Sequence, residues 1–330
     1  MPVNKIENKS LYLIDGYAML YRSHFALIRN PLINSKGMHT SALFGFINQI
    51  MKLINKDKPD LMVAAFDTSK KTFRHEKYPE YKATREKMPE EMIGQLPYLW
   101  KILEAMGIPT LERPGFEADD IIGTLATMAS KEDLDVFIVS GDKDFMQLVN
   151  EKIFLYSPSG RQADIKIYDR NGVIDKWGVP PEKIIDLLGL MGDSSDNVPG
   201  VPGVGEKTAV KLINEYGSLE ASLDHADEVR NKRAREGLQN ARNEAFLSKE
   251  LVTIDTNMDI DIDFSTLKTN DIDKGSLVDI FQELEFESLQ KQILGSAGAV
   301  QKKKDVPKKD YKALLSEDEI NHKTDHLIKQ

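Results

Sequence analysis

Residues 11–16 have the sequence Leu-Tyr-Leu-Ile-Asp-Gly, a short apolar run that ends in an aspartate and a glycine. Two more apolar runs, 61–66 and 136–139, are followed by Asp67 and by Ser-Gly-Asp142. Short apolar runs bounded by turn residues are typical of strands that are buried on both faces. The three runs therefore predict strands of a buried sheet, each with an acid at or just after its end.

Segments with apolar residues at helical spacing lie between these strands. We expect helices at 42–55, 91–106 and 116–130, and further short strands at 107–111 and 153–156. Strands that alternate with helices are typical of a mostly parallel sheet with helices on both faces. The predicted fold class is therefore α/β, with a mostly parallel central sheet flanked by helices.

The pattern changes near residue 180. We predict an α/β domain at 1–180, a mainly helical region at 181–295 and a Lys-rich linker at 296–309. Residues 310–330 are too few to fold alone and are expected to begin a truncated following domain. Within the helical region we expect helices at 183–191 and 207–216, further helices or helix-strand pieces at 245–253 and 277–284, and a segment at 289–294 that closes the compact part.

The composition is that of an ordinary soluble globular protein, with 41% hydrophobic and 29% charged residues among 330. The absence of cysteine excludes disulfides and thiolate metal sites, and it fits a cytoplasmic location. No apolar run approaches the roughly 20 residues of a membrane span, so no membrane association is expected. The net charge of −9 taken alone argues against nucleic acid as a partner. Whether nucleic acid can bind therefore depends on how the charges are distributed along the chain.

Acidic residues gather around the predicted strand ends. Ligands of open parallel sheets bind at the carboxyl ends of the strands, so acids there should converge on one crevice. Carboxylates packed together repel one another, and a hard divalent cation such as Mg²⁺ or Mn²⁺ is the simplest counter-charge. The absence of cysteine, with six histidines in the chain, disfavours zinc. The candidate metal ligands are Asp15, Asp67, Glu117, Asp119, Asp120, Asp142, Asp144, Asp193 and Asp196.

Each acid also has an ordinary structural interpretation. Asp15 with Gly16 suits a strand-ending turn, and Asp67 suits a helix cap. The acids of 117–120 suit the first turn of a helix, where negative charge is favourable. All nine acids together favour metal-assisted phosphate chemistry, in which two ions about 3.5–4 Å apart clamp the attacking and leaving oxygens.

A basic segment follows the second predicted strand. Residues 70–87 contain seven Lys or Arg and three Glu, interleaved with Phe73, Tyr78 and Tyr81. Cations that face phosphates and rings that stack on bases suit a single strand of nucleic acid. A solvated charged loop is the alternative for any such run, and the neighbouring acids favour the functional interpretation.

A Gly- and Pro-rich turn joins two of the predicted helices. Residues 200–207 have the sequence Gly-Val-Pro-Gly-Val-Gly-Glu-Lys. Glycines let the backbone approach a phosphate, and the next helix presents its first N–H groups. The pattern predicts a helix-hairpin-helix in which Gly203, Gly205 and Lys207 contact a duplex backbone, with a plain helix–helix turn as the alternative.

Seven short motifs occur in a fixed order along the chain. They are Leu-Ile-Asp-Gly (13–16), Phe-Asp (66–67), Thr-Phe-Arg-His-Glu (72–76), Tyr-Lys-Ala-Thr-Arg (81–85), Gly-Phe-Glu-Ala-Asp-Asp (115–120), Gly-Asp-Lys-Asp (141–144) and Gly-Asp-Ser-Ser-Asp-Asn-Val-Pro-Gly (192–200). Together they resemble the 5′ nuclease (flap endonuclease) family, and most closely the N-terminal 5′→3′ exonuclease domains of bacterial DNA polymerase I. The resemblance covers about residues 10–295.

The resemblance implies a PIN-like 5′ nuclease fold, with a helical arch at about 70–95 and an H3TH form of the helix-hairpin-helix. It also implies two Mg²⁺ or Mn²⁺ sites. The acids from Asp15 to Asp120 would form the first site and those from Asp142 to Asp196 the second. Asp119 would serve between the two sites.

The same resemblance implies roles for basic and aromatic residues. Arg74, Lys82 and Arg85 would lie in the arch and act at the scissile phosphate, and Tyr81 would stack on a base. Arg22 matches a basic residue near the active site of the family. A K⁺ ion would bind main-chain carbonyls of the hairpin turn.

We therefore expect a structure-specific 5′→3′ exonuclease and 5′-flap endonuclease that hydrolyses DNA phosphodiester bonds at flaps, nicks or branches, in primer removal and repair. The resemblance implies a monomer, with proofreading-type and polymerase domains in the same polypeptide. A non-catalytic nucleic-acid-binding module on the same scaffold is the alternative. A Mg²⁺ phosphatase is a weaker alternative, because Tyr17 stands where that class generally has a second Asp after the nucleophile.

Overall fold

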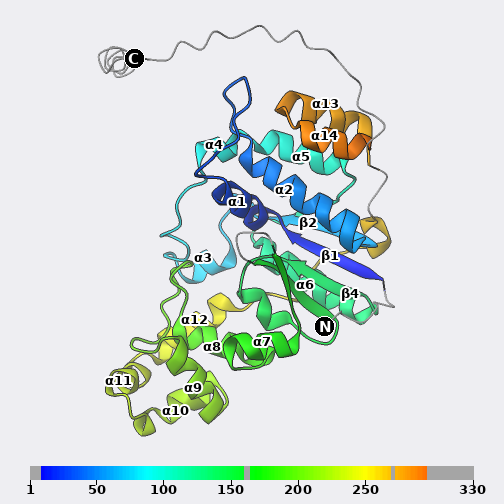
Figure 1. Cartoon of the computed structure of the whole chain (residues 1–330). Helices are drawn as coiled ribbons and strands as arrows, with labels where there is room; N and C mark the ends of the chain where they lie inside the picture. The colour runs from blue at the N-terminus through cyan, green and yellow to red at the C-terminus, as the bar shows by residue number, and fades with distance from the viewer. Residues whose placement is uncertain (1–8, 160–163, 269–271, 296–330) are drawn as a thin grey trace, which may run out of the picture.

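A six-stranded sheet forms the centre of the computed structural model, which describes residues 9–159, 164–268 and 272–295 (Figure 1). The strand order is β3-β2-β1-β4-β5-β6; the first five strands are parallel and β6 is antiparallel to β5. The strands are β1 (Ser10–Asp15), β2 (Leu61–Phe66), β3 (Thr110–Glu112), β4 (Asp135–Val139), β5 (Ile153–Ser159) and β6 (Asp164–Tyr168). The predicted mostly parallel sheet is confirmed, and the antiparallel edge strand was not predicted.

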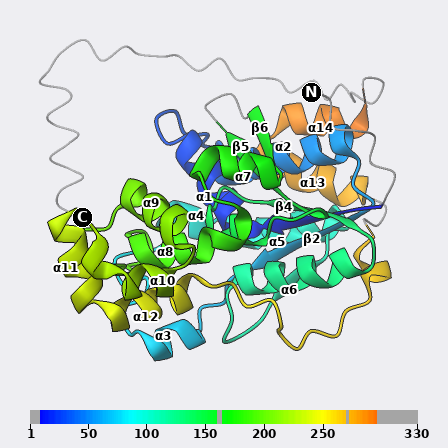
Figure 2. The ribbon, with the colours of Figure 1, turned by 90° about the horizontal axis from the view of Figure 1, so that it is seen from below.

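Helices cover both faces of the sheet, as Figure 2 shows. Leu11 and Leu13 of β1 point into one apolar cluster, while Tyr12 and Ile14 point into the other. Alternation of this kind is the side-chain period of a strand, and burial on both sides explains the uninterrupted apolar runs. The first cluster includes α6 (Ala118–Lys131), and the second includes α1 (Gly16–Ala26), α2 (Ser41–Lys52) and α5 (Leu96–Ala105).

The pairing of the strands sets three carboxyl ends level with one another. Asp15 pairs with Ala65 of β2, and Ile14 pairs with Val139 of β4. The next turns of the chain after β2 and β4 therefore begin at the same edge of the sheet as the end of β1. This edge is where the predicted acids lie.

Two helices differ in their boundaries from the ranges predicted for them. The helix expected at 42–55 is α2, which continues as a π-helical turn, η1 (Leu53–Asp57). The helix expected at 91–106 is divided into α4 (Glu90–Ile93) and α5, with Pro97 in the first turn of α5. Proline lacks the backbone N–H needed inside a helix, so it starts α5 instead of continuing α4.

The expected helical arch at 70–95 is only partly helical. It consists of α3 (Phe73–Lys77), a series of turns over 79–84, and α4. Lys82 has a φ of 56°, in the left-handed region that ends helical runs in non-glycine residues. The basic segment at 70–87 therefore folds as one short helix, α3, followed by turns.

A helical lobe follows the sheet. Its helices are α7 (Arg170–Trp177), α8 (Ile184–Met191), α9 (Glu206–Tyr216), α10 (Leu219–Asp224), α11 (Lys232–Asn240) and α12 (Arg242–Val252). The short 3₁₀ turns of the chain are η2 (Asp144–Leu148), η3 (Pro181–Lys183), η4 (Ala226–Glu228) and η5 (Phe264–Leu267). Three of the five predicted segments correspond to α8, α9 and α12, and the other two fall in the last two helices, described next; α7, α10 and α11 were not predicted.

The last two helices of the described chain pack against helices that cover the sheet, and not against the helical lobe. α13 (Lys274–Leu284) and α14 (Glu287–Leu294) contribute Leu277, Phe281 and Leu289 to the apolar cluster that contains α2 and α5. In packing terms the helical region expected at 181–295 therefore ends before α13. The expected linker and the residues after it lie outside the described residues. Within the described part of the chain, no helix is long and apolar enough to cross a membrane.

Candidate active site

Two strand-end acids are held in place at the level edge of the sheet. Asp15 accepts hydrogen bonds from the N–H of Ala18 at 3.2 Å and from Ser140 Oγ at 2.8 Å. Asp67 Oδ1 accepts the N–H of Ala118, the first residue of α6, at 2.8 Å. Asp15 therefore caps α1, where a strand-ending turn was the ordinary interpretation, and Asp67 supports the start of the distant α6; both are fixed at the edge where β1 and β2 end.

The pKa values show that several acids share one electrostatic field. The pKa of Asp15 is raised to about 7, mainly by burial and further by the charges of Asp67 and Asp142, against the opposing hydrogen bonds from Ser140 and Ala18. The pKa of Asp119 is also well above its ordinary value, first because of burial and then because of Asp15 and Asp142. A cation placed among these carboxylates would favour their charged forms.

A second group of acids lies beside the first. Burial and the neighbouring Asp142 raise the pKa of Asp144, whose Oδ1 is buried and has no hydrogen-bond donor among the described residues. Lys143 Nζ forms an ion pair with Asp193 and lies 3.9 Å from Asp144 Oδ1. Burial works to raise the pKa of Asp193, but hydrogen bonds from Lys143 and Ser195 outweigh it and lower the pKa.

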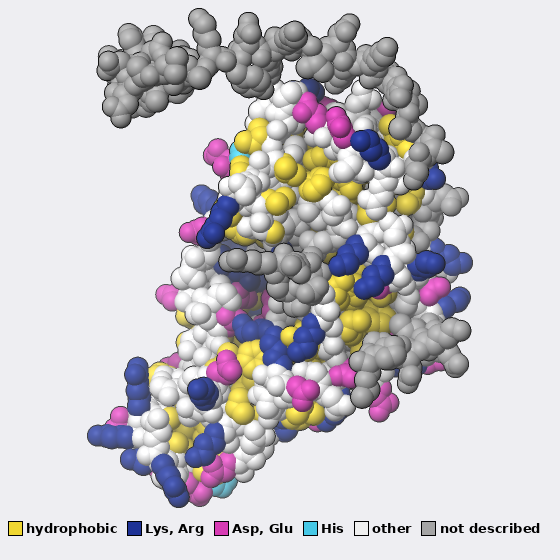
Figure 3. All heavy atoms as spheres, in the orientation of Figure 1, with side chains coloured by type: hydrophobic (Ala, Val, Ile, Leu, Met, Phe, Trp, Pro, Cys, Tyr) yellow, Lys and Arg dark blue, Asp and Glu magenta, His cyan; other side chains and the backbone are white. Residues whose placement is uncertain are grey.

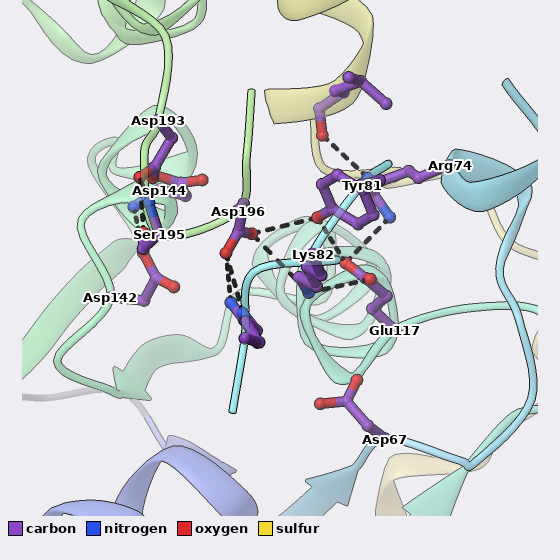
Figure 4. Close-up of polar contacts among 12 residues, drawn as sticks. Asp67, Arg74, Tyr81, Lys82, Glu117, Asp142, Asp144, Asp193, Ser195 and Asp196 are labelled. Atoms are coloured by element: carbon purple, nitrogen blue, oxygen red, sulfur yellow. Dashed lines mark hydrogen bonds and ion pairs between the residues drawn. The ribbon is translucent and has the colours of Figure 1, made fainter. Parts of the chain in front are cut away.

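Three residues of the predicted arch connect the two groups. Lys82 Nζ lies 2.9 Å from Glu117 Oε1 and 3.8 Å from Asp196 Oδ2. The Tyr81 hydroxyl lies 3.1 Å from Glu117 Oε2 and 3.2 Å from Asp196 Oδ2, and Arg85 Nε donates to Asp196 Oδ1 at 3.0 Å. Figure 4 shows Tyr81 and Lys82 between two sets of acids, with Asp142, Asp144 and Asp193 on one side and Asp67 on the other.

Arg74 and Asp120 are buried and paired with each other. The Arg74 side chain is 2% exposed and forms a two-pronged ion pair with Asp120, at 2.7 and 2.8 Å. Arg74 also donates to the carbonyls of Leu251 and Thr253 and lies 3.4 Å from Glu117 Oε2. Asp120 is fully buried, and its oxygens accept two further backbone N–H groups. We therefore leave both residues out of the proposed metal and phosphate site.

Two other predicted contact residues have different surroundings. The ring of Tyr81 is buried and packs edge-on against His75, so in this structure it is not open to stacking on a base. Arg22 lines a pocket with Ser140, Gly141 and Asp142, next to the second group of acids. This position suits a cation that meets the backbone of a strand near the site.

The predicted hairpin joins α8 to α9. Gly203 has a φ of +82°, and Gly205 is the residue that precedes the first turn of α9. Lys207 is exposed in that first turn. The three residues lie in the helical lobe, and Gly203 and Gly205 are in the same connection between α8 and α9 as Asp193 and Asp196.

Lys143 and Ser140 contact the predicted acids, although the sequence interpretation gave them no role. Ser140 orients both Asp15 and the backbone of Asp142, and Lys143 pairs with Asp193. The available signal was their position inside the segment 140–144, between two candidate ligands.

The donor set fits a hard divalent cation. All the donors are carboxylate oxygens, which hard divalent cations prefer. Burial and mutual repulsion raise the pKa of Asp15, Asp119 and Asp144, and Oδ1 of Asp144 is buried without a hydrogen bond. In the described part of the chain, no three acidic or histidine side chains are grouped closely enough to enclose one ion. Lys82, Arg85 and Lys143 neutralise the acids instead.

Comparison with known proteins identifies the family. Residues 10–178 match the family described as "5'-3' exonuclease, N-terminal resolvase-like domain", and residues 179–275 match "5'-3' exonuclease, C-terminal SAM fold". A "5'-3' exonuclease" of Aquifex aeolicus is 40% identical over 86% of this chain and 95% of its own length. The chain belongs to the 5′-3′ exonuclease family. The family resemblance expected from the motifs is thus confirmed.

Two further comparisons define the context. DNA polymerase I of Bacillus subtilis is 43% identical over 87% of this chain, which spans only 32% of that relative's length. Among solved structures, a bacteriophage T5 flap endonuclease in complex with DNA and metal ions has a TM-score of 0.62 at 21% identity, covering 87% of this chain and 98% of its own. The catalytic core of Rad2 in complex with a DNA substrate has a TM-score of 0.59 at 18% identity, covering 87% of this chain and 92% of its own. These two structures share the fold of this 5′-3′ exonuclease family member.

The raised carboxylate pKa values predict a specific pH dependence of stability without metal. A group with a raised pKa stabilises the folded state most below its unfolded pKa and loses that contribution as the pH rises through the folded pKa. For Asp15 this window runs from about pH 4 to about 7, with a loss on the order of 4 kcal/mol. Thermal unfolding in EDTA should therefore show a Tm that falls across this window, and Mg²⁺ should cancel much of the fall.

Asp15→Asn is the control for this pH prediction. Asparagine can still accept the Ala18 N–H and cannot ionise, so the variant should show a shallower fall of Tm in EDTA. An unchanged slope in the variant would show that Asp15 is not the titrating group.

Proposed function

We propose that this chain hydrolyses DNA phosphodiester bonds at 5′ flaps, nicks and branches, as a 5′→3′ exonuclease and flap endonuclease that uses two Mg²⁺ or Mn²⁺ ions. The observation that carries the proposal is the convergence of buried, mutually repelling carboxylates beneath Lys82 and Arg85. A site that only bound DNA would gain nothing from acids that repel phosphate.

Each group of acids would hold one ion. Asp15, Asp67, Glu117 and Asp119 fit the first, and Asp142, Asp144, Asp193 and Asp196 fit the second, with Asp119 close enough to Asp142 to interact with both groups. When bound, the ions lower the pKa of water and stabilise charge on the attacking and leaving oxygens. Lys82 and Arg85, which pair with Glu117 and Asp196 in this structure, would donate to the non-bridging oxygens of the scissile phosphate.

The remaining contacts would hold the DNA. The hairpin at Gly203, Gly205 and Lys207 would bind the backbone of the duplex, with K⁺ on its main-chain carbonyls, and Arg22 would meet the strand beside Asp142. Two solved structures with this fold contain DNA, which supports DNA as the partner.

The setting of the activity is proposed from the relatives. Several are named DNA polymerase I, and the chain spans about a third of their length. We infer that the protein acts as a monomer in the cytoplasm, in primer removal and repair, with proofreading-type and polymerase domains in the same polypeptide.

The proposed activity can be tested with a 5′-flap substrate labelled at its 5′ end. Mg²⁺ or Mn²⁺ should support cleavage near the junction, the downstream product should carry a 5′-phosphate, and EDTA should abolish the reaction. Cleavage that resists EDTA would contradict the two-metal proposal. Release of phosphate from small monoesters at rates that rival DNA cleavage would favour a phosphatase instead.

A further inference from the structure

The segment from Val229 to Arg242, which contains α11, is strongly basic. It has five Lys or Arg and one Glu, in a chain whose net charge is −9. Asn231 caps the helix, accepting the N–H of Ala234 at 3.2 Å. Ala234, Gly237 and Leu238 form the buried side of α11, so its opposite side carries most of the charge to the surface.

α11 packs directly on the hairpin turn. A Cβ atom built on Gly237 would lie 1.9 Å from the carbonyl oxygen of Pro202, so only glycine permits this approach. A Cβ atom built on Gly203 would lie 2.7 Å from Cγ of Arg233. The side chain of Arg233 therefore starts beside the turn that is proposed to hold the duplex.

The cations of this surface differ in how far they are already neutralised. Arg242 pairs with Asp224 at 2.8 Å, and Lys232 has a loose exposed pair with Glu236 at 3.8 Å. Within the described ranges, no acidic side chain pairs with Arg230 or Arg233, and both are exposed.

Figure 3 shows basic side chains gathered on the lobe formed by α9, α10 and α11. In Figure 1 this lobe lies at the opposite end of the molecule from α13 and α14. Lys207 and Lys211 are exposed on α9, which follows the hairpin, and α11 packs on the hairpin itself. The positive surface is thus continuous with the hairpin.

We propose that Arg230, Lys232 and Arg233 form a second contact with the phosphate backbone of the duplex, next to the stretch held by the hairpin. This inference rests on the proposed function and extends the duplex that the protein recognises. Exposed cations without strong partners gain free energy by replacing the counterions of DNA, whatever its sequence. The contact would add affinity and orient the duplex without touching the reacting phosphate.

The test is a triple variant, Arg230→Gln, Lys232→Gln and Arg233→Gln, compared with the unaltered chain. Affinity is measured with Ca²⁺ in place of Mg²⁺, from about 50 to 200 mM salt, on flap substrates whose downstream duplex has about 10 or about 30 base pairs. On the longer duplex, the slope of log K against log salt should be shallower by about 2 to 3 for the triple variant than for the unaltered chain, since each phosphate contact contributes about 0.9 to its steepness. In kcat at saturating DNA, the triple variant should match the unaltered chain on both duplexes.

Two controls separate the outcomes. Lys131→Gln, Lys268→Gln and Lys291→Gln remove the same charge from exposed positions on α6, after η5 and on α14, and should leave both slopes unchanged. Lys207→Gln should weaken binding to both duplex lengths. Equal slopes for the triple variant and the unaltered chain on the longer duplex would overturn the proposal. Failure of the unaltered chain to bind or cut any flap substrate would instead refute the proposed function itself.

Discussion

Replacement of Asp142 by asparagine should lower the rate of flap cleavage at least about 1,000-fold, with DNA affinity nearly unchanged. Asp142 faces both groups of acids, because its charge acts on Asp15, Asp119 and Asp144 alike. Asparagine keeps an oxygen that can accept the N–H of Asp144, now at 2.9 Å from Asp142 Oδ1. The fold should therefore persist while the negative charge that holds a cation is lost.

The same variant should change stability in a way that a simple folding defect would not. Without metal it should be as stable as the unaltered chain or more stable near pH 7, because one source of repulsion is gone. With Mg²⁺ it should gain less Tm than the unaltered chain. Asp175→Asn, an exposed acid of α7, is the matched control and should change neither quantity. Full cleavage by Asp142→Asn would remove this residue from the site.

Replacement of Arg74 by methionine should lower the free energy of unfolding by about 3–5 kcal/mol. Arg74 is the cation of Asp120, which is fully buried, and it also donates to the carbonyls of Leu251 and Thr253 at the end of α12. The variant would leave a buried carboxylate without its counter-charge and two carbonyls without a donor. Urea unfolding monitored by circular dichroism measures the loss.

The chain offers a matched control for Arg74. Lys77 of the same helix pairs with Glu250 of α12 at 2.6 Å, but both side chains are about half exposed. Lys77→Met should cost less than about 1 kcal/mol, as surface pairs do. A double variant, Arg74→Met with Asp120→Leu, should recover part of the loss, because no uncompensated charge remains. Equal effects of Arg74→Met and Lys77→Met would show that burial does not matter here.

The sheet and the edge where its acids lie were predictable, because parallel strands buried on both faces give uninterrupted apolar runs. Asp15, Asp67 and Asp142 follow those runs directly, so their common edge follows from the fold class. The antiparallel strand β6 was missed, since its alternation of polar and apolar residues extends over only five residues.

Other features depend on contacts between distant segments, which sequence spacing does not show. Arg74 and Asp120 are 46 residues apart, and nothing local distinguishes them from the arch cations and metal ligands beside them. The helix α11 buries only Ala234, Gly237 and Leu238, so it has no apolar stripe that predicts a helix. The return of α13 and α14 to the sheet lobe is likewise a matter of tertiary packing.

The most direct test of the two-metal account is the number of Mn²⁺ ions bound per chain, measured by electron paramagnetic resonance in the presence of a flap substrate with a non-cleavable linkage. The account predicts two ions for the unaltered chain. It predicts fewer for Asp142→Asn, together with the loss of cleavage. Two tightly bound ions in Asp142→Asn, or efficient cleavage by a chain that binds none, would contradict it.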